Sequence, residues 1–183
     1  MSYRVSNEIF LSFLSLNRLF LLLVIINFIF SFQLFAGESE KTLGKETGLV
    51  IPRFVSIKVD KAYLRRGPSK DHKIDWVYKR RNLPMKIIDE FRYWRKVEDF
   101  QGYQGWMHKS LFYGKRYIIV KKEETLLRNK NNFEGLGKAL LKKDVIAKML
   151  SCDLLWCFIE VEKLRGWVLK ADIWGTKSGK VSE

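Results

Sequence analysis

One short phrase occurs twice in this sequence, and it limits the architectures that the chain can adopt. The first copy reads GYQGWMHKSLFYG from Gly102, and the second reads GWVLKADIWG from Gly166. In both copies a Gly-Trp pair is followed by a Lys and then by an apolar residue, an aromatic residue and a final Gly. A phrase repeated within a chain of 183 residues is typical of duplicated structural units.

The match between the two copies continues towards the N-terminus of each. YLRRGPS from Tyr63 aligns with LLRNKNN from Leu126, and RYWRKVED from Arg92 aligns with LLWCFIEV from Leu154. Short runs rich in Val, Ile, Leu and aromatic residues alternate with polar or Gly-containing breaks, which is typical of small all-β domains. The sequence therefore predicts two β units, over residues 54–114 and 115–175.

Residues 1–36 differ from the rest of the chain and have the pattern of an export signal. Arg4 and Arg18 precede an uncharged apolar run from Leu19 to Phe30. This run is shorter than the about 20 residues that a membrane-spanning helix needs, although SFQLFA extends it to Ala36. Two interpretations stay open, a signal peptide cleaved after Ala36 and a retained signal anchor.

Polar segments flank the predicted units. Residues 37–53 are rich in Gly, Thr, Glu and Lys and have no apolar period, which predicts a linker. Residues 176–183 form a predicted tail. The stretch GKRYIIVKKEE, residues 114–124, joins the two units and has few flexible residues, so we expect the units to pack together in a fixed orientation.

The only two cysteines, Cys152 and Cys157, lie close together in SCDLLWC. In an exported protein they face an oxidising compartment, and strands that flank a short turn bring two Cβ atoms to disulfide distance. The rival interpretation is a metal pair, but zinc needs four ligands. The chain adds only His72 and His108, both in the first unit. We therefore expect a disulfide that staples a hairpin, and no metal site.

The motifs of the first unit resemble those of the bacterial SH3 domain, a small open β-barrel found in many exported proteins. YLRRGPS places Arg65 two positions before Gly67, RYWRKVED supplies a central Trp, and Gly105-Trp106 precedes a short turn that ends at Leu111. The second unit departs from the pattern, because NKN stands where the Gly-Pro turn belongs. The resemblance implies an all-β chain of two SH3-like open barrels in tandem, packed together, the second one diverged.

The resemblance also implies a ligand groove, lined by the loop after the first strand and by the aromatic side chains that flank it. The candidate ligand-binding residues are Lys70, Asp71, His72, Trp76, Tyr93 and Trp94. Trp76 and Trp94 are equally well explained as core residues, because large aromatic rings dominate small cores. Tyr93 and His72 are the better candidates for exposed contact.

Catalysis finds little support in the residue pattern. A thiol nucleophile needs an unpaired cysteine, and a serine nucleophile needs a histidine oriented by a carboxylate. Ser69 or Ser110 with His72 or His108 are the only candidates, and their spacing is unremarkable. We expect no enzymatic activity and no cofactor.

The net charge of +14 would attract an anionic partner, although a compositional bias towards Lys, Asn, Ile and Phe explains the charge equally well. If the chain is exported, the available partners are wall peptides, acidic glycans, phospholipid headgroups and envelope proteins, and nucleic acid is disfavoured. We therefore expect a non-catalytic binding module in the periplasm or cell envelope, with a possible membrane tether through residues 1–36. The alternative is an interaction scaffold that positions a partner enzyme; binding of single-stranded nucleic acid is a third, weaker reading.

Overall fold

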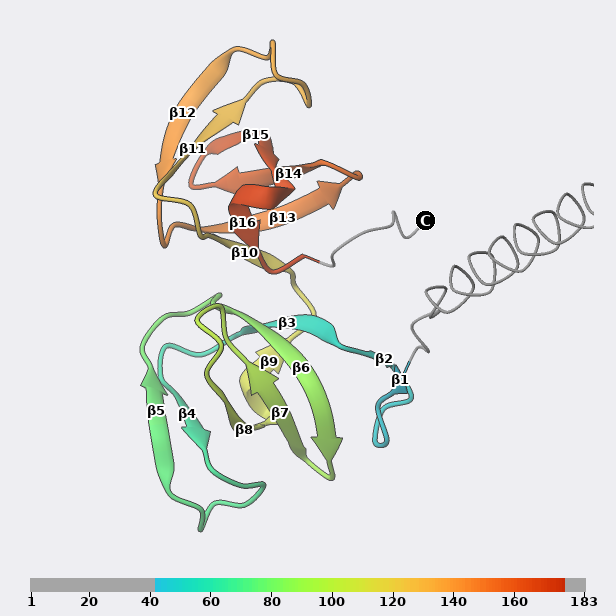
Figure 1. The fold of residues 1–183 in the computed structure, drawn as a ribbon. Helices are drawn as coiled ribbons and strands as arrows, with labels where there is room; N and C mark the ends of the chain where they lie inside the picture. The colour runs from blue at the N-terminus through green and yellow to red at the C-terminus, as the bar shows by residue number, and fades with distance from the viewer. Residues whose placement is uncertain (1–41, 177–183) are drawn as a thin grey trace, which may run out of the picture. The chain divides into compact units, whose positions relative to one another are not determined.

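The computed structural model describes residues 42–176 of the chain, which form β-strands joined by turns and two short 3-10 helices (Figure 1). The strands of the first sheet are β3 (Arg53–Ile57), β4 (Ala62–Arg65), β5 (Ile74–Tyr78), β6 (Pro84–Phe91), β7 (Trp94–Glu98), β8 (Gln104–His108) and β9 (Phe112–Tyr113). Those of the second sheet are β10 (Tyr117–Val120), β11 (Glu124–Arg128), β12 (Gly137–Lys142), β13 (Ile146–Cys152), β14 (Trp156–Val161), β15 (Leu164–Leu169) and β16 (Ile173–Trp174). The 3-10 helices are η2 (Lys109–Leu111) and η3 (Lys170–Asp172).

The two seven-stranded sheets share one topology. The first has the strand order β5-β4-β8-β7-β6-β3-β9, and the second has the order β12-β11-β15-β14-β13-β10-β16. Each strand of the first sheet therefore has a counterpart at the same place in the second. The end strands of each sheet do not pair with each other within the described residues, so both sheets stay open. This architecture confirms the predicted all-β fold of two open SH3-like units in tandem.

The longest strands of the two sheets are bulged at corresponding places. The register shifts between Ile87 and Asp89 in β6 and between Met149 and Ser151 in β13. Strict alternation would put Ile87 and Glu90 on opposite faces of β6. The extra residue in the bulge returns Glu90 to the interior, where it is 2% exposed.

Each sheet encloses its own apolar core, and one strand connects the two cores. The first core contains Ile57, Leu64, Met85 and Val97, and the second contains Leu127, Met149, Ile159 and Val168. Ile119 of β10 pairs within the second sheet but is fully buried in the first core. The strand that opens the second sheet therefore also completes the packing of the first.

Polar and aromatic contacts also join the two sheets, whose residues belong to one compact unit. The Arg80 Nη2 atom donates to the Asp144 carbonyl at 2.6 Å, and the Tyr117 N–H donates to the Ser56 hydroxyl at 3.2 Å. The Phe54 ring meets the Trp174 ring edge-on at 4.9 Å between centroids. These contacts fit the expectation that the two units pack together.

The described part of the expected linker is an ordered hairpin. Strands β1 (Thr42–Leu43) and β2 (Val50–Ile51) pair with each other, and Ile51 is buried against the first core. The turn between them bonds to Glu90, whose carboxylate accepts the Thr47 N–H at 2.9 Å and the Glu46 N–H at 3.1 Å. These two anchors, one apolar and one polar, order a segment whose composition is that of a linker.

The predicted signal or anchor at residues 1–36 and the last seven residues of the predicted tail lie outside the described residues. Within residues 42–176 no helix is long and apolar enough to cross a membrane.

Candidate functional site

A groove of about 330 Å³ lies on the outer face of the first sheet. Strand β8 sits between β4 and β7 and sets the register on both sides, because Trp106 pairs with Arg65 and His108 pairs with Trp94. Side chains two apart on a strand share a face, so these four residues lie opposite the buried Leu64 and Met107. The groove is lined by Tyr63, Arg65, Lys70, Trp94, His108, Ser110 and Leu111.

The lining contains two cationic residues, Arg65 and Lys70, and no acidic residue. A third cation, Lys109, stands beside the groove with its Nζ atom 4.9 Å from the centre of the Tyr93 ring. Cations and aromatic faces attract each other, and together they suit a ligand that carries both anionic and apolar parts. The groove can therefore hold a carboxylate-bearing ligand without an opposing negative charge.

His108 fixes the turn that closes one end of the groove. It precedes η2, and its Nδ1 atom accepts the Ser110 N–H at 3.3 Å and lies 2.6 Å from the Ser110 hydroxyl. Burial, followed by the positive charges of Lys70, Lys109 and Arg95, lowers the pKa of His108. The lowered pKa favours the neutral ring, and the hydrogen bond from the Ser110 N–H favours the tautomer in which Nδ1 is the acceptor.

Aromatic side chains stand at the same end. Trp94 meets the His108 ring edge-on at 5.5 Å between centroids, and Tyr93 lies 6.2 Å from it. The Lys109 N–H donates to the Tyr93 carbonyl at 2.8 Å, which ties η2 to the β6–β7 turn. Tyr93 is 62% exposed. Its backbone is held while its ring is free to contact a ligand.

The loop from Arg66 to Lys73 carries Lys70 and is held by internal hydrogen bonds. The Arg65 Nη1 atom donates to the His72 carbonyl at 2.8 Å, and the Ser69 hydroxyl lies 2.9 Å from His72 Nδ1. The His72 ring packs directly on Gly67, where a Cβ atom would lie 2.3 Å from it. A side chain at residue 67 would therefore displace this ring from its place in the loop that carries Lys70.

The structure brings together most, but not all, of the residues predicted to bind a ligand. Lys70 and Trp94 line the groove, Tyr93 adjoins it, and Asp71 and His72 belong to the loop beside it. Trp76 lies elsewhere, since it is 43% exposed on β5, stacks on Tyr103 at 5.0 Å and lines a different cavity. Trp76 is therefore neither a core residue nor a groove residue.

Five lining residues were not predicted as ligand-binding. They are Tyr63, Arg65, His108, Ser110 and Leu111. Strand alternation could have found two of them, because Tyr63 and Arg65 flank the buried Leu64. The others depend on how β8 pairs with β7, which no local pattern reveals.

Both serine–histidine pairs considered for catalysis do form hydrogen bonds, but they close turns. A nucleophilic serine needs its histidine oriented by a carboxylate. The charged groups that act on His108 are Lys70, Lys109 and Arg95, all of them cations. In the described residues, moreover, no cluster of three His, Cys, Asp or Glu side chains could hold a metal ion.

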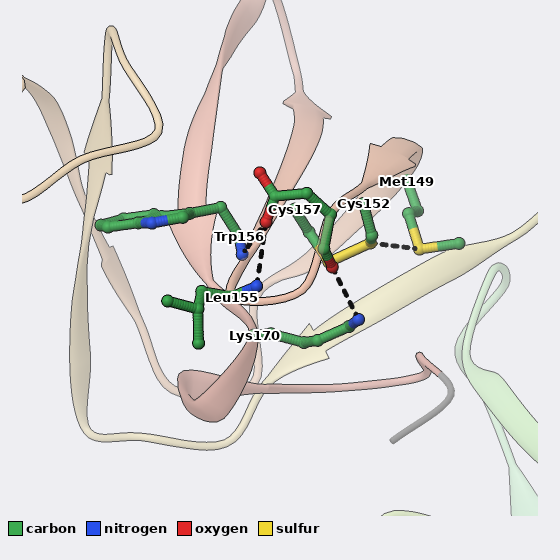
Figure 2. The surroundings of a disulfide bond; sticks show 7 residues. Met149, Cys152, Leu155, Trp156, Cys157 and Lys170 are labelled. Atoms are coloured by element: carbon green, nitrogen blue, oxygen red, sulfur yellow. Dashed lines mark hydrogen bonds between the residues drawn. A yellow bond between two sulfur atoms is a disulfide. The ribbon is translucent and has the colours of Figure 1, made fainter. Parts of the chain in front are cut away.

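The predicted disulfide between Cys152 and Cys157 is confirmed, and it closes the β13–β14 hairpin of the second sheet (Figure 2). The Asp153 carboxylate accepts the Leu155 N–H at 2.9 Å and the Trp156 N–H at 2.7 Å, and Lys170 Nζ donates to the Asp153 carbonyl at 2.8 Å. The hairpin is therefore fixed both covalently and by hydrogen bonds.

Two solved structures align with this chain, both at low TM-score and low sequence identity. The structure of NlpC1 from Trichomonas vaginalis aligns with a TM-score of 0.33 and 9% identity over 72% of this chain and 48% of that one. NlpC2 from the same organism aligns with a TM-score of 0.32 and 8% identity over 67% and 48%. The chain thus spans about half the length of either structure, and no curated protein matches it. Residues 58–114, which run from the end of β3 through β9, match the family model of the bacterial SH3 domain, and this match confirms the resemblance carried by the sequence motifs.

Proposed function

We propose that this protein is an exported, non-catalytic binding module of the cell envelope that recognises peptidoglycan peptides through the groove of its first sheet. The observation that carries the proposal is the lining of that groove, in which Arg65 and Lys70 stand beside the rings of Tyr63 and Trp94. Peptides of the wall carry carboxylates on short, partly apolar chains, and this lining offers positive charge and apolar faces together.

The groove is also preorganised, because hydrogen bonds hold the two segments that border it. The loop that carries Lys70 is closed by the Arg65–His72 hydrogen bond, and the η2 turn is closed by His108. Side chains that are already held lose less conformational entropy on binding. This preorganisation favours recognition of a defined ligand over general attraction to negative charge.

The disulfide supports an envelope location. Bonds between cysteines persist in oxidising compartments and are rare in reducing ones. Together with the export pattern of residues 1–36, the Cys152–Cys157 bond favours the periplasm or the outer side of the inner membrane. The retained-anchor interpretation places the module on a tether at the membrane surface.

Chemical-shift mapping with soluble peptidoglycan fragments tests the ligand. We expect saturable shifts at Tyr63 and Arg65, at the indole N–H of Trp94 and at the His108 ring. Trp76 and Tyr103 form a matched control, since they are exposed aromatic residues that lie outside the groove. Shifts confined to the Trp76–Tyr103 pair, or none at all, would refute this assignment.

A second candidate function is an interaction scaffold that positions a partner enzyme. It is favoured by the burial of Ile119 in the first core, since this residue belongs to a strand of the second sheet. A scaffold of this kind must behave as one rigid body. Calorimetry of the full chain then gives a single cooperative transition, and two separate transitions would exclude the scaffold.

A further inference from the structure

A second, smaller cavity lies next to η2, and the proposed function makes no use of it. Its volume is about 200 Å³. It adjoins the groove through η2, because Lys109 lines the cavity while Ser110 and Leu111 line the groove. The cavity is lined by Arg53, Val55, Ile87, Arg95, Lys109, Phe112 and Tyr113.

Positive charge in this cavity exceeds the negative charge available to balance it. Three of the lining residues, Arg53, Arg95 and Lys109, are cations, and none is an acid. The nearest balancing group is Glu90, which lies 2.6 Å from Arg53 Nη2 and 3.4 Å from Arg95 Nε. One carboxylate thus faces two guanidinium groups, and the charge of Lys109 is added to theirs.

The carboxylate of Glu90 is also engaged by hydrogen-bond donors other than these cations. Its two oxygens also accept the Thr47 hydroxyl at 2.9 Å and the N–H groups of Glu46 and Thr47. The carboxylate is completely buried under the β1–β2 turn that supplies these donors. Glu90 therefore fixes the guanidinium groups in place without neutralising both of them.

The side chains of the two arginines are mostly buried, so an unbalanced positive charge on them is energetically unfavourable. The Arg53 side chain is 16% exposed and that of Arg95 is 6% exposed. Burial lowers the pKa of Arg53 against the opposing effect of Glu90, and the charge of Arg95 lowers it further. The Arg53 Nε atom is also buried without a hydrogen-bond partner. An anion would relieve both the charge excess and the unpaired donor.

We propose that this cavity binds a small oxoanion, a carboxylate or phosphate group, between Arg53, Arg95 and Lys109. Guanidinium groups pair with both classes through planar, two-point hydrogen bonds. Val55, Ile87 and Phe112 form apolar walls, which lower the local dielectric constant and strengthen such bonds. The site shares Lys109 with the edge of the neighbouring groove, but the inference does not require that the groove binds wall peptides.

Nitrogen-detected or proton–nitrogen NMR of the arginine Nε–H groups in the full chain tests the site directly. The probes are sodium phosphate and sodium acetate, titrated separately at constant ionic strength. We expect the Nε–H signals of Arg53 and Arg95 to shift and saturate with at least one of them. The tighter probe identifies the chemical class of the anion. No shift, or shifts that stay linear in concentration with both probes, would overturn the proposal.

A pair of charge-matched variants separates a built site from general attraction. Lys109→Gln removes a lining cation without touching Glu90, and we expect it to weaken anion binding by about fivefold, as loss of one charge-assisted contact implies. Lys58→Gln removes the same charge from an exposed residue that lines neither cavity, and it should leave the affinity unchanged. Equal weakening by both would reduce the effect to overall charge. If the wild-type protein shows the anion-induced shifts but does not bind peptidoglycan, the proposed function is refuted and the anion site is still supported.

Discussion

Gly105 of β8 lies directly against Leu64 of β4, so that a Cβ atom on this glycine would come within 2.6 Å of the Leu64 Cγ atom. The second sheet repeats the contact, since a Cβ atom on Gly166 would lie 2.8 Å from Leu127 Cγ and 2.6 Å from the Arg128 carbonyl oxygen. The Gly-Trp phrase therefore occurs twice because each sheet needs a close approach of two strands at this place.

Alanine at either glycine should be destabilising. Gly105→Ala and Gly166→Ala each force a methyl group against a packed leucine and a backbone carbonyl, at a cost of about 1–3 kcal/mol. Gly114→Ala is the matched control, since nothing lies within 4 Å of its added Cβ atom. Urea unfolding checks the three variants. Equal stability of Gly105→Ala and Gly114→Ala would contradict the packing role.

Tyr93→Ala should weaken ligand binding and leave the melting temperature nearly unchanged. The ring is exposed and contacts Lys109 and His108 at the end of the groove, so its removal costs little packing. Tyr103→Ala, an exposed tyrosine outside the groove, serves as the control in the same assay with peptidoglycan fragments. A large loss of stability in Tyr93→Ala would assign the ring to the core instead.

Glu90→Gln should destabilise the fold by about 3 kcal/mol, because it leaves two buried guanidinium groups without their carboxylate. Glu98→Gln is the control, since Glu98 pairs with Lys86 near the surface and should contribute less than about 1 kcal/mol. Chemical denaturation measures both. A cost for Glu90→Gln no larger than that for Glu98→Gln would show that the buried network is dispensable.

The contribution of Glu90 should also depend on pH. Burial alone would raise the pKa of Glu90, but the hydrogen bonds from Thr47 and Glu46 and the charges of Arg95 and Arg53 outweigh it and lower the pKa. The stabilisation is then complete above the unfolded pKa and is lost as pH falls through the lower folded value. The stability gap between wild type and Glu90→Gln should therefore begin to narrow as the pH falls below about 5, and it should narrow further as the pH falls through the lower folded-state pKa. A constant gap would contradict the assignment.

Binding of an anionic ligand should strengthen as the solution becomes more acidic. His108 has a lowered pKa because of its burial and three nearby cations, and a bound carboxylate would raise that pKa again. Proton uptake then accompanies binding, so affinity should rise as pH falls below the ordinary histidine pKa of about 6.5. His108→Gln should abolish the dependence. If the affinity of the wild type does not change with pH, His108 does not contact the ligand.

Most of the fold could be predicted from the sequence, because several contacts that define it are made by glycine and cysteine residues at recognisable positions. Gly105 and Gly166 mark the same close approach, and Cys152 and Cys157 mark a cross-strand pair. The β1–β2 hairpin could not be predicted this way. Its polar anchors are backbone N–H groups that bond to Glu90, more than forty residues away in the chain, and main-chain donors leave no signature in composition.

The candidate site was predictable only in part, for a related reason. Lys70 and Trp94 belong to segments with a motif, whereas His108 joins them through the pairing of β7 with β8. Trp76 looks like a groove residue in the sequence because it follows the same loop as Lys70. On β5, however, its ring stacks on Tyr103 instead. Which exposed aromatic residue lines a groove depends on long-range register.

Co-sedimentation of the full chain with intact peptidoglycan sacculi across a salt series tests the proposed function most directly. We predict that binding persists beyond about 0.3 M salt, where the screening length falls to about 6 Å. Lys70→Glu should abolish this binding, whereas the charge-matched control Lys58→Glu should preserve it. Binding that disappears at low salt, or that both variants weaken equally, would mean that the net charge of +14 merely attracts an acidic polymer.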